Sequence, residues 1–167
     1  MYREMRRKKQ ILSNKETISV LEKCTSGVLA VLGDDGYPYT VPLSYVYEGK
    51  TNKIYFHSAK TGHKIDAIRK LDKVSFCVIE QDQIVPERFT TYYRSVIVFG
   101  RIQVIESGEK WQDAIHKLIS RYSPNESSEN IQKEIKTASQ FCILEMSIEH
   151  MTGKEAIELV REKQEKS

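Results

Sequence analysis

The sequence predicts a mainly β protein with flanking helices, and three observations support this prediction. Short apolar segments with the alternation of strands recur along the chain. They are not separated by the regularly spaced helices of βαβ units, which argues against a Rossmann domain. The longest segment, residues 90–105, carries Gly100 directly after an apolar run. A bulge at such a glycine is typical of a strand that curls around a barrel.

Length and composition predict a single domain over residues 1–167. With 40% hydrophobic and 29% charged residues, the chain can form one core, or one protomer of a dimer. No apolar run approaches the ~18 residues that span a bilayer, so we expect a soluble, cytoplasmic protein with no membrane partner. Cys24, Cys77 and Cys142 lie far apart without a C-x-x-C pair, which predicts reduced core cysteines rather than disulfides or a zinc site.

Both ends of the chain are charged. The net charge is only +3, but five Arg or Lys residues stand against one Glu within residues 1–10. Such an arm can contact nucleic-acid or membrane phosphates, yet no aromatic platform or second basic stripe accompanies it. We therefore interpret residues 1–12 as a solvated basic arm and residues 154–167 as a charged tail, and we expect no nucleic-acid partner.

The N-terminal part predicts a short helix followed by a hairpin. Ser13 and Glu16 have the spacing of a capping box at the start of a helix. Residues 27–32 form a near-continuous apolar run, residues 34–36 have turn chemistry, and alternation resumes afterwards. The pattern therefore predicts a hairpin over residues 26–47.

Two prolines interrupt the second strand of this hairpin. Pro38 and Pro42 donate no ladder hydrogen bond, so the strand must lie at an edge or beside a gap in the sheet. A gap could hold a planar heterocycle against the free backbone groups of residues 41–44. Protection of a sheet edge explains the prolines equally well.

The junction within residues 52–71 is the strongest candidate for a binding site. Apolar alternation gives way to helical spacing between His57 and Gly62. Cations crowd the start of the helix, where the helix dipole makes them cost about 0.3–1 kcal/mol each. A phosphate held by the helix N–H groups, the hydroxyls of Ser58 and Thr61, and Lys64 would reverse this cost. The alternative is a surface turn in which Ser58 or Thr61 caps the helix and the lysines are solvated.

The C-terminal part predicts two further strands and two helices around the long strand 90–105. We expect a strand over residues 73–81, a loop over residues 81–89, a helix over residues 107–122 and a weaker helix over residues 127–137. A last strand over residues 141–148 is followed by a turn at Thr152 and Gly153 and then by the charged tail.

The long strand carries one arginine among tyrosines. Alternation places Tyr92, Arg94 and Val96 on one face, and Tyr93, Ser95 and Ile97 on the other. Arg94 could pair with a carboxylate or phosphate of a ligand. A solvated arginine at the mouth of a strand is the alternative.

Several common catalytic motifs are absent from the sequence. It contains no G-x-S-x-G elbow, Walker loop or G-x-G-x-x-G motif, and its four histidines lack metal-ligand spacing such as H-E-x-x-H. We therefore expect neither a metal site nor hydrolytic chemistry.

Four segments together identify a family resemblance. They are MRRKKQ near the start, DDGYPYTVPLSYVY, IYFHSAKTGHK and YYRSVIVFGRIQVI. In this order the sequence resembles the pyridoxamine 5′-phosphate oxidase-like split-barrel flavoproteins, and among them the 5-nitroimidazole reductase-related group, over residues 5–154. The resemblance implies a six-stranded antiparallel split β-barrel that binds FMN at a homodimer interface.

The resemblance also implies which residues contact FMN. The segment of Val41, Pro42, Leu43 and Ser44 would run beside the isoalloxazine ring. The phosphate or ribityl end would be held by His57, Ser58 and Lys64. Further flavin contacts, some across the dimer, would come from Tyr93, Arg94 and Ser95. For His57, a catalytic role and a purely binding role both stay open.

Three hypotheses follow for the function. The leading one is an FMN-dependent oxidoreductase that takes electrons from NAD(P)H and reduces a nitroimidazole or another small nitroaromatic compound, with the cofactor carrying the redox step. The second is a non-catalytic flavin- or haem-binding split-barrel protein, in which haem would need an axial ligand such as His57. The third is an interaction module that uses the basic arm.

Overall fold

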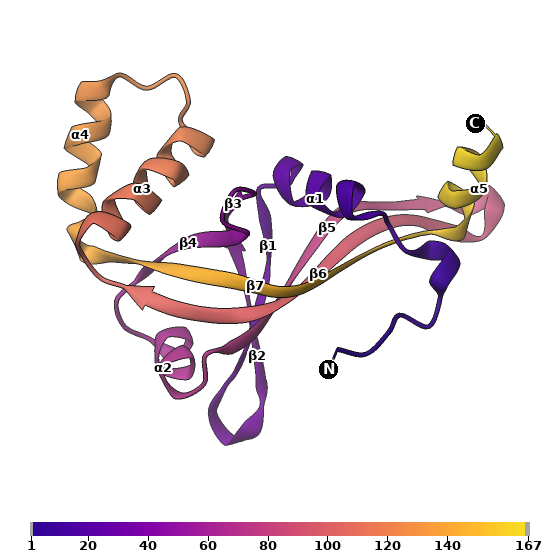
Figure 1. Ribbon diagram of the computed structural model, residues 1–167, viewed down its shortest axis with the longest axis horizontal. Helices are drawn as coiled ribbons and strands as arrows, with labels where there is room; N and C mark the ends of the chain where they lie inside the picture. The colour runs from indigo at the N-terminus through magenta and orange to yellow at the C-terminus, as the bar shows by residue number, and fades with distance from the viewer. Residues whose placement is uncertain (1, 166–167) are drawn as a thin grey trace.

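The computed structural model describes residues 2–165, and a twisted antiparallel sheet forms its centre (Figure 1). The sheet has seven strands in the order β2-β1-β5-β6-β7-β4-β3. The strands are β1 (Ser26–Leu32), β2 (Pro38–Ser44), β3 (Val46–Glu48), β4 (Lys53–Ala59), β5 (Lys73–Val85), β6 (Thr90–Ile105) and β7 (Phe141–Glu155). The helices are α1 (Asn14–Lys23), α2 (His63–Lys70), α3 (Glu109–Tyr122), α4 (Ser128–Thr137) and α5 (Ile157–Glu165).

The expectation of six strands was therefore wrong, because the second strand of the predicted hairpin is two strands. At Tyr45 the backbone leaves the ladder: its N–H lies 3.1 Å from the carbonyl of Thr25 and 2.9 Å from the hydroxyl of Tyr122. β2 and β3, on either side of this break, form the two opposite edges of the sheet. β2 also comes close to β4 without pairing with it. The sheet therefore curls toward a barrel, but no hydrogen-bonded ladder closes it between β2 and β4.

Two strand ends also differ from the prediction. β5 continues to Val85 where a loop was expected, and β7 continues to Glu155 through the turn expected at Thr152 and Gly153. The reason is β6, which pairs with both neighbours along its length, so that Val85 lies opposite Thr90 and Glu155 opposite Arg94. Pairing with β6 therefore keeps these polar segments in strand conformation, although their composition is typical of loops.

The hydrophobic core consists of two clusters. The larger one lies between the inner face of the sheet and helices α1 and α2, and includes Leu29, Phe56 and Phe76, all fully buried. The smaller one lies where α3 packs on β4 and β7, around Trp111 and Ile143. The helix predicted over residues 107–122 therefore packs its apolar side against the sheet.

Several local predictions are confirmed. Ser13 and Glu16 form a complete capping box at the start of α1. The β6–β7 register shifts between Phe99 and Gly100, and a Cβ at Gly100 would lie 2.2 Å from the Ser147 carbonyl oxygen, so only glycine fits this bulge. All three cysteines are free, but only Cys142 is buried in the core, whereas Cys24 and Cys77 are half-buried. Within residues 2–165, no helix has the length and apolar character needed to cross a bilayer.

One exposed apolar patch covers the outer face of β1, β5 and β6. Register places Val28 opposite Cys77 and Cys77 opposite Ile97, and even spacing puts the other members on the same face. Ile79 is 61% exposed. We call this surface the outer patch, and its exposed members are Val28, Leu32, Ile79, Ile97 and Phe99.

The link between α1 and α5 should make stability depend on pH. The carboxylate of Glu16 accepts hydrogen bonds from the Lys163 ammonium and from the hydroxyl and N–H of Ser13, and these contacts lower its pKa from 4.5 to about 2. Because the folded pKa lies below the unfolded one, the stabilisation is present above pH ~4.5 and is lost as the pH falls toward 2. Since Glu16 is half-exposed, the effect should be about 1 kcal/mol or less.

We therefore expect Glu16→Gln, which keeps the capping box, to lower the urea midpoint at pH 6 and to reduce its fall between pH 5 and pH 3. Urea unfolding at a series of pH values measures this. Glu87→Gln serves as the control, because Glu87 is exposed and has no ion pair within residues 2–165. A variant with the same pH profile as wild type would contradict the assignment.

Candidate functional site

The junction of β4 and α2 leaves the start of a helix open. Gly62 precedes α2 with φ of 114°, a conformation that favours glycine, and no side chain caps the helix. The alternative of a turn capped by Ser58 or Thr61 is therefore not realised. The first N–H groups of an uncapped helix carry a partial positive charge and are available to an anion.

Two side chains at this junction have polar groups without partners. Ser58 is buried and Lys64 is half-buried, and neither makes a hydrogen bond or ion pair within residues 2–165. Burial lowers the pKa of the Lys64 ammonium, because desolvation disfavours its charged form. The sulfur of Cys142, which lies opposite Ser58 in the ladder, is close enough to Lys64 to affect this pKa. A bound phosphate would supply the missing negative charge, so these residues fit an anionic cofactor.

His57 lies on the other face of β4. It is exposed, and its ring meets the edge of Phe141 with 6.2 Å between centroids. Strand alternation turns its side chain away from that of Ser58, toward the layer that α3 covers. The structure thus separates His57 from the hydroxyl and ammonium that fit a phosphate.

The edge strand β2 lies beside this junction. Pro38 and Pro42 sit opposite Leu32 and Val28 on a strand with a neighbour on one side only, which confirms the edge position. Val41 and Leu43 pack against the core, whereas Pro42 and Ser44 are exposed.

The side chain of His63, the first residue of α2, contacts the hairpin that contains β2. The ring of His63 stacks on that of Tyr39 with 4.2 Å between centroids, and the backbone N–H of Asp34 donates to its Nε2 at 3.3 Å. The structure therefore brings five of the predicted residues to one region, namely Val41, Pro42, Leu43, Ser58 and Lys64.

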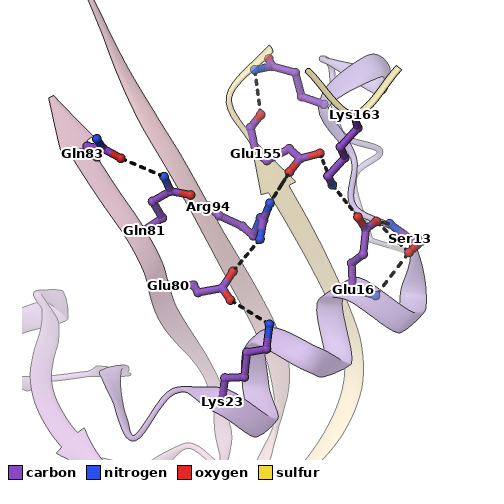
Figure 2. A network of polar contacts seen from close by, with 10 residues as sticks. Ser13, Glu16, Lys23, Glu80, Gln81, Gln83, Arg94, Glu155 and Lys163 are labelled. Atoms are coloured by element: carbon purple, nitrogen blue, oxygen red, sulfur yellow. Dashed lines mark hydrogen bonds and ion pairs between the residues drawn. The ribbon is translucent and has the colours of Figure 1, made fainter. Parts of the chain in front are cut away.

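Arg94 is engaged elsewhere, in the ion-pair network of Figure 2. Its guanidinium donates to Glu155 at 2.9 Å and to Glu80 at 3.1 Å. Glu80 also pairs with Lys23 of α1, and Glu155 pairs with Lys163 of α5. Arg94 therefore ties β5, β6 and β7 to the helices, with both of its acidic partners in its own chain.

The other two predicted residues of β6 point to the outer face. Tyr93 accepts a hydrogen bond from Gln10 Nε2 at 3.2 Å, and Ser95 lies opposite Lys154 in the ladder with β7. On β7, Arg94 pairs with Glu155 near one end and His57 with Ile143 near the other. Within one chain, Tyr93, Arg94 and Ser95 are therefore far from Ser58 and Lys64.

Sequence reasoning missed Lys154. Its ammonium lies 5.2 Å from the centroid of the Tyr93 ring. The predicted turn at Thr152 and Gly153 assigned this lysine to the charged tail. Extending the alternation of β7 past residue 148 would have placed it on a strand.

Solved structures share this fold. A candidate 5-nitroimidazole antibiotic resistance protein from Bacteroides thetaiotaomicron has a TM-score of 0.70 at 19% identity, over 86% of this chain and 85% of that chain. An FAD-binding protein from Mesorhizobium loti has a TM-score of 0.60 at 25% identity, over 88% and 97%. An FAD and haem binding protein from Mycobacterium smegmatis has a TM-score of 0.67 at 17% identity, over 89% and 73%.

The sequence itself matches one family. No curated protein matches the chain. The family described as pyridoxamine 5′-phosphate oxidase matches residues 13–155, a span that runs from the cap of α1 to the end of β7 and includes every predicted site residue. The chain therefore belongs to the pyridoxamine 5′-phosphate oxidase family.

Proposed function

We propose that the protein is an FMN-dependent oxidoreductase. The observation that carries this proposal is the half-buried ammonium of Lys64, which lacks a counter-charge and lies at an uncapped helix start that also offers the free hydroxyl of Ser58. A dianionic phosphate satisfies all three features at once. The family match and the FAD-binding neighbour support a flavin as the molecule that carries this phosphate.

In this proposal the protein binds and orients, and the cofactor supplies the redox chemistry. The unpaired edge of β2 at residues 41–44 offers backbone groups to the flavin ring, while Ser58 and Lys64 hold the phosphate. Electrons would come from NAD(P)H and pass to a small nitro compound, which the likeness to the candidate 5-nitroimidazole resistance protein favours. Three free cysteines suit the reducing cytoplasm, which we propose as the location.

A second candidate function is haem or flavin binding without turnover. The FAD and haem binding neighbour favours it. Haem requires an axial ligand, and the exposed imidazole of His57 is available for this. The absorption spectrum of the purified protein separates the cases, because oxidised flavin, haem and an empty protein differ in visible absorption.

We further propose that the protein is a homodimer formed through the outer patch. Contiguous exposed apolar surface on a sheet face indicates an interface. A two-fold packing of this patch on itself would also bring Tyr93 and Ser95 near a second chain. Each chain would then contribute to both flavin sites.

The dimer is testable by changing the patch. We expect Ile79→Lys with Ile97→Lys to shift the protein from dimer to monomer at micromolar concentration, because charges buried in an interface without partners are costly. Sedimentation velocity measures this. Leu71→Lys is the control, since Leu71 is exposed and directly follows α2, which packs on the inner face of the sheet. A wild-type protein that sediments as a monomer with FMN bound would contradict the dimer.

Lys64→Ala tests the phosphate site. A charge-assisted hydrogen bond is worth about 1.5–3 kcal/mol, so we expect the FMN dissociation constant to rise roughly ten- to hundred-fold. The unfolding midpoint should change little, and riboflavin, which lacks the phosphate, should bind wild type and variant alike. Fluorescence titration measures both affinities, with Lys50→Ala as the exposed control. Equal FMN affinity of Lys64→Ala and wild type would exclude this site.

His57→Asn tests whether His57 lies apart from Ser58 and Lys64, the residues proposed to hold the phosphate. We expect the variant to keep its FMN affinity within about three-fold, because alternation turns the imidazole away from Ser58. If the imidazole delivers a proton to the reduced substrate, turnover per bound flavin should fall on the order of a hundred-fold. Flavin occupancy and the rate of nitro-compound reduction are measured on the same sample. Loss of flavin without loss of turnover per flavin would instead assign His57 to binding.

A further inference from the structure

A cavity of about 400 Å³ lies beside α3 and α4, at the end of the molecule away from α5 (Figure 1). Four segments line it: the link between β4 and α2, the link between β6 and α3, the first turn of α3, and the end of α4 with the turn that follows. Its volume falls in the range of ligand sites, roughly 300–1,000 Å³. Because these segments are far apart in sequence, tertiary packing forms the cavity.

One side of the cavity is apolar and fixed in position. Trp111 is 6% exposed, and its Nε1 donates to the carbonyl oxygen of Phe141 at 3.3 Å. Ile135 of α4 also lines the cavity and packs against the same core cluster as Trp111. Since the indole N–H is already engaged, Trp111 offers apolar ring surface to a ligand. A planar ring suits this side.

The rim of the cavity carries two cations without counter-charges. Lys60, in the link between β4 and α2, is half-buried, and Lys136 of α4 is exposed. Neither makes a hydrogen bond or an ion pair within residues 2–165. Glu106 lines the cavity too, but its carboxylate is bound by Arg69 of α2 at 2.9 Å. The positive charge of the two lysines is therefore uncompensated and favours an anion.

Uncharged donors lie around the same space. Ser107 and Ser139 bring hydroxyls and Gln112 brings an amide, and the side chains of all three lack hydrogen-bond partners within residues 2–165. A few polar groups around an apolar surface are the usual composition of a small-molecule site.

We propose that this cavity binds a small aromatic anion, with its ring against Trp111 and Ile135 and its acidic group contacted by Lys60 and Lys136. Carboxylate and phosphate oxygens both accept hydrogen bonds from an ammonium, so both chemistries fit. Within residues 2–165, the lining includes none of the residues proposed to hold FMN. The inference therefore does not rest on the proposed function.

The sequence provides a reporter for this site, because Trp111 is its only tryptophan. The full-length protein is titrated with phenylacetate and, separately, with phenyl phosphate, and tryptophan emission is followed. We expect a saturable change with a dissociation constant on the order of 1 mM or below for at least one probe. The tighter of the two identifies the acidic group. 2-Phenylethanol, which keeps the ring without the charge, should bind at least about ten-fold more weakly.

Matched variants test the two lysines. We expect Lys60→Met with Lys136→Met to raise the dissociation constant of the tighter probe roughly ten-fold or more, because methionine keeps the stem and removes the charge. Lys133→Met is the control, since Lys133 is on the same helix but lines a separate hollow between α3 and α4. Lys60→Gln with Lys136→Gln replaces the first variant if its melting temperature falls.

Three results would overturn the inference. The first is the absence of a saturable emission change with either probe over the millimolar range. The second is equal probe affinity of the lysine variant and wild type. The third is displacement of the probe by FMN, measured by isothermal titration calorimetry, which would assign the probe to the proposed flavin site. A wild-type protein that binds the probe but no flavin contradicts the proposed function and supports this cavity as a separate site.

Discussion

The pairing of β6 with both of its neighbours is the constraint on which the rest of the structure depends. β6 has 16 residues and holds β5 on one side and β7 on the other. At about 3.3 Å per residue, the 12 steps of β7 from Ile143 to Glu155 span roughly 40 Å. A cofactor pocket of roughly 300–1,000 Å³ is about 7–10 Å across. One chain therefore cannot bring the Arg94 end of β6 and the Lys64 region to the same ligand.

This constraint also explains which parts of the fold could be predicted. The capping box, the bulge at Gly100 and the edge position of the proline-containing strand each follow from a few adjacent residues. The ends of β5 and β7 do not, because residues 81–85 are mostly polar and their strand form comes from pairing with β6. The seventh strand was missed for a similar reason: the break at Tyr45 depends on Tyr122, 77 residues away.

The candidate site shows the same limit at the level of single residues. Local spacing indicated Ser58, Gly62 and Lys64, and the structure leaves this helix start uncapped and its lysine without a counter-charge. Arg94 looked equally suited to a phosphate from its neighbours in sequence. Its acidic partners lie 14 and 61 residues away, so its pairing could not be recognised locally. Lys154 shows the opposite case: its sequence neighbours assigned it to a charged tail, whereas pairing with β6 places it on strand β7.

Charge distinguishes the proposed site from the rest of the molecule. The cations near α1 and α5 are neutralised by carboxylates, whereas Lys64 is half-buried without one. Burial lowers the pKa of the Lys64 ammonium, because desolvation disfavours its charged form. A phosphate at the uncapped start of α2 would turn this cost into an attractive contact. Binding of an anionic cofactor would then stabilise the folded chain, because the cofactor binds the folded state and not the unfolded one.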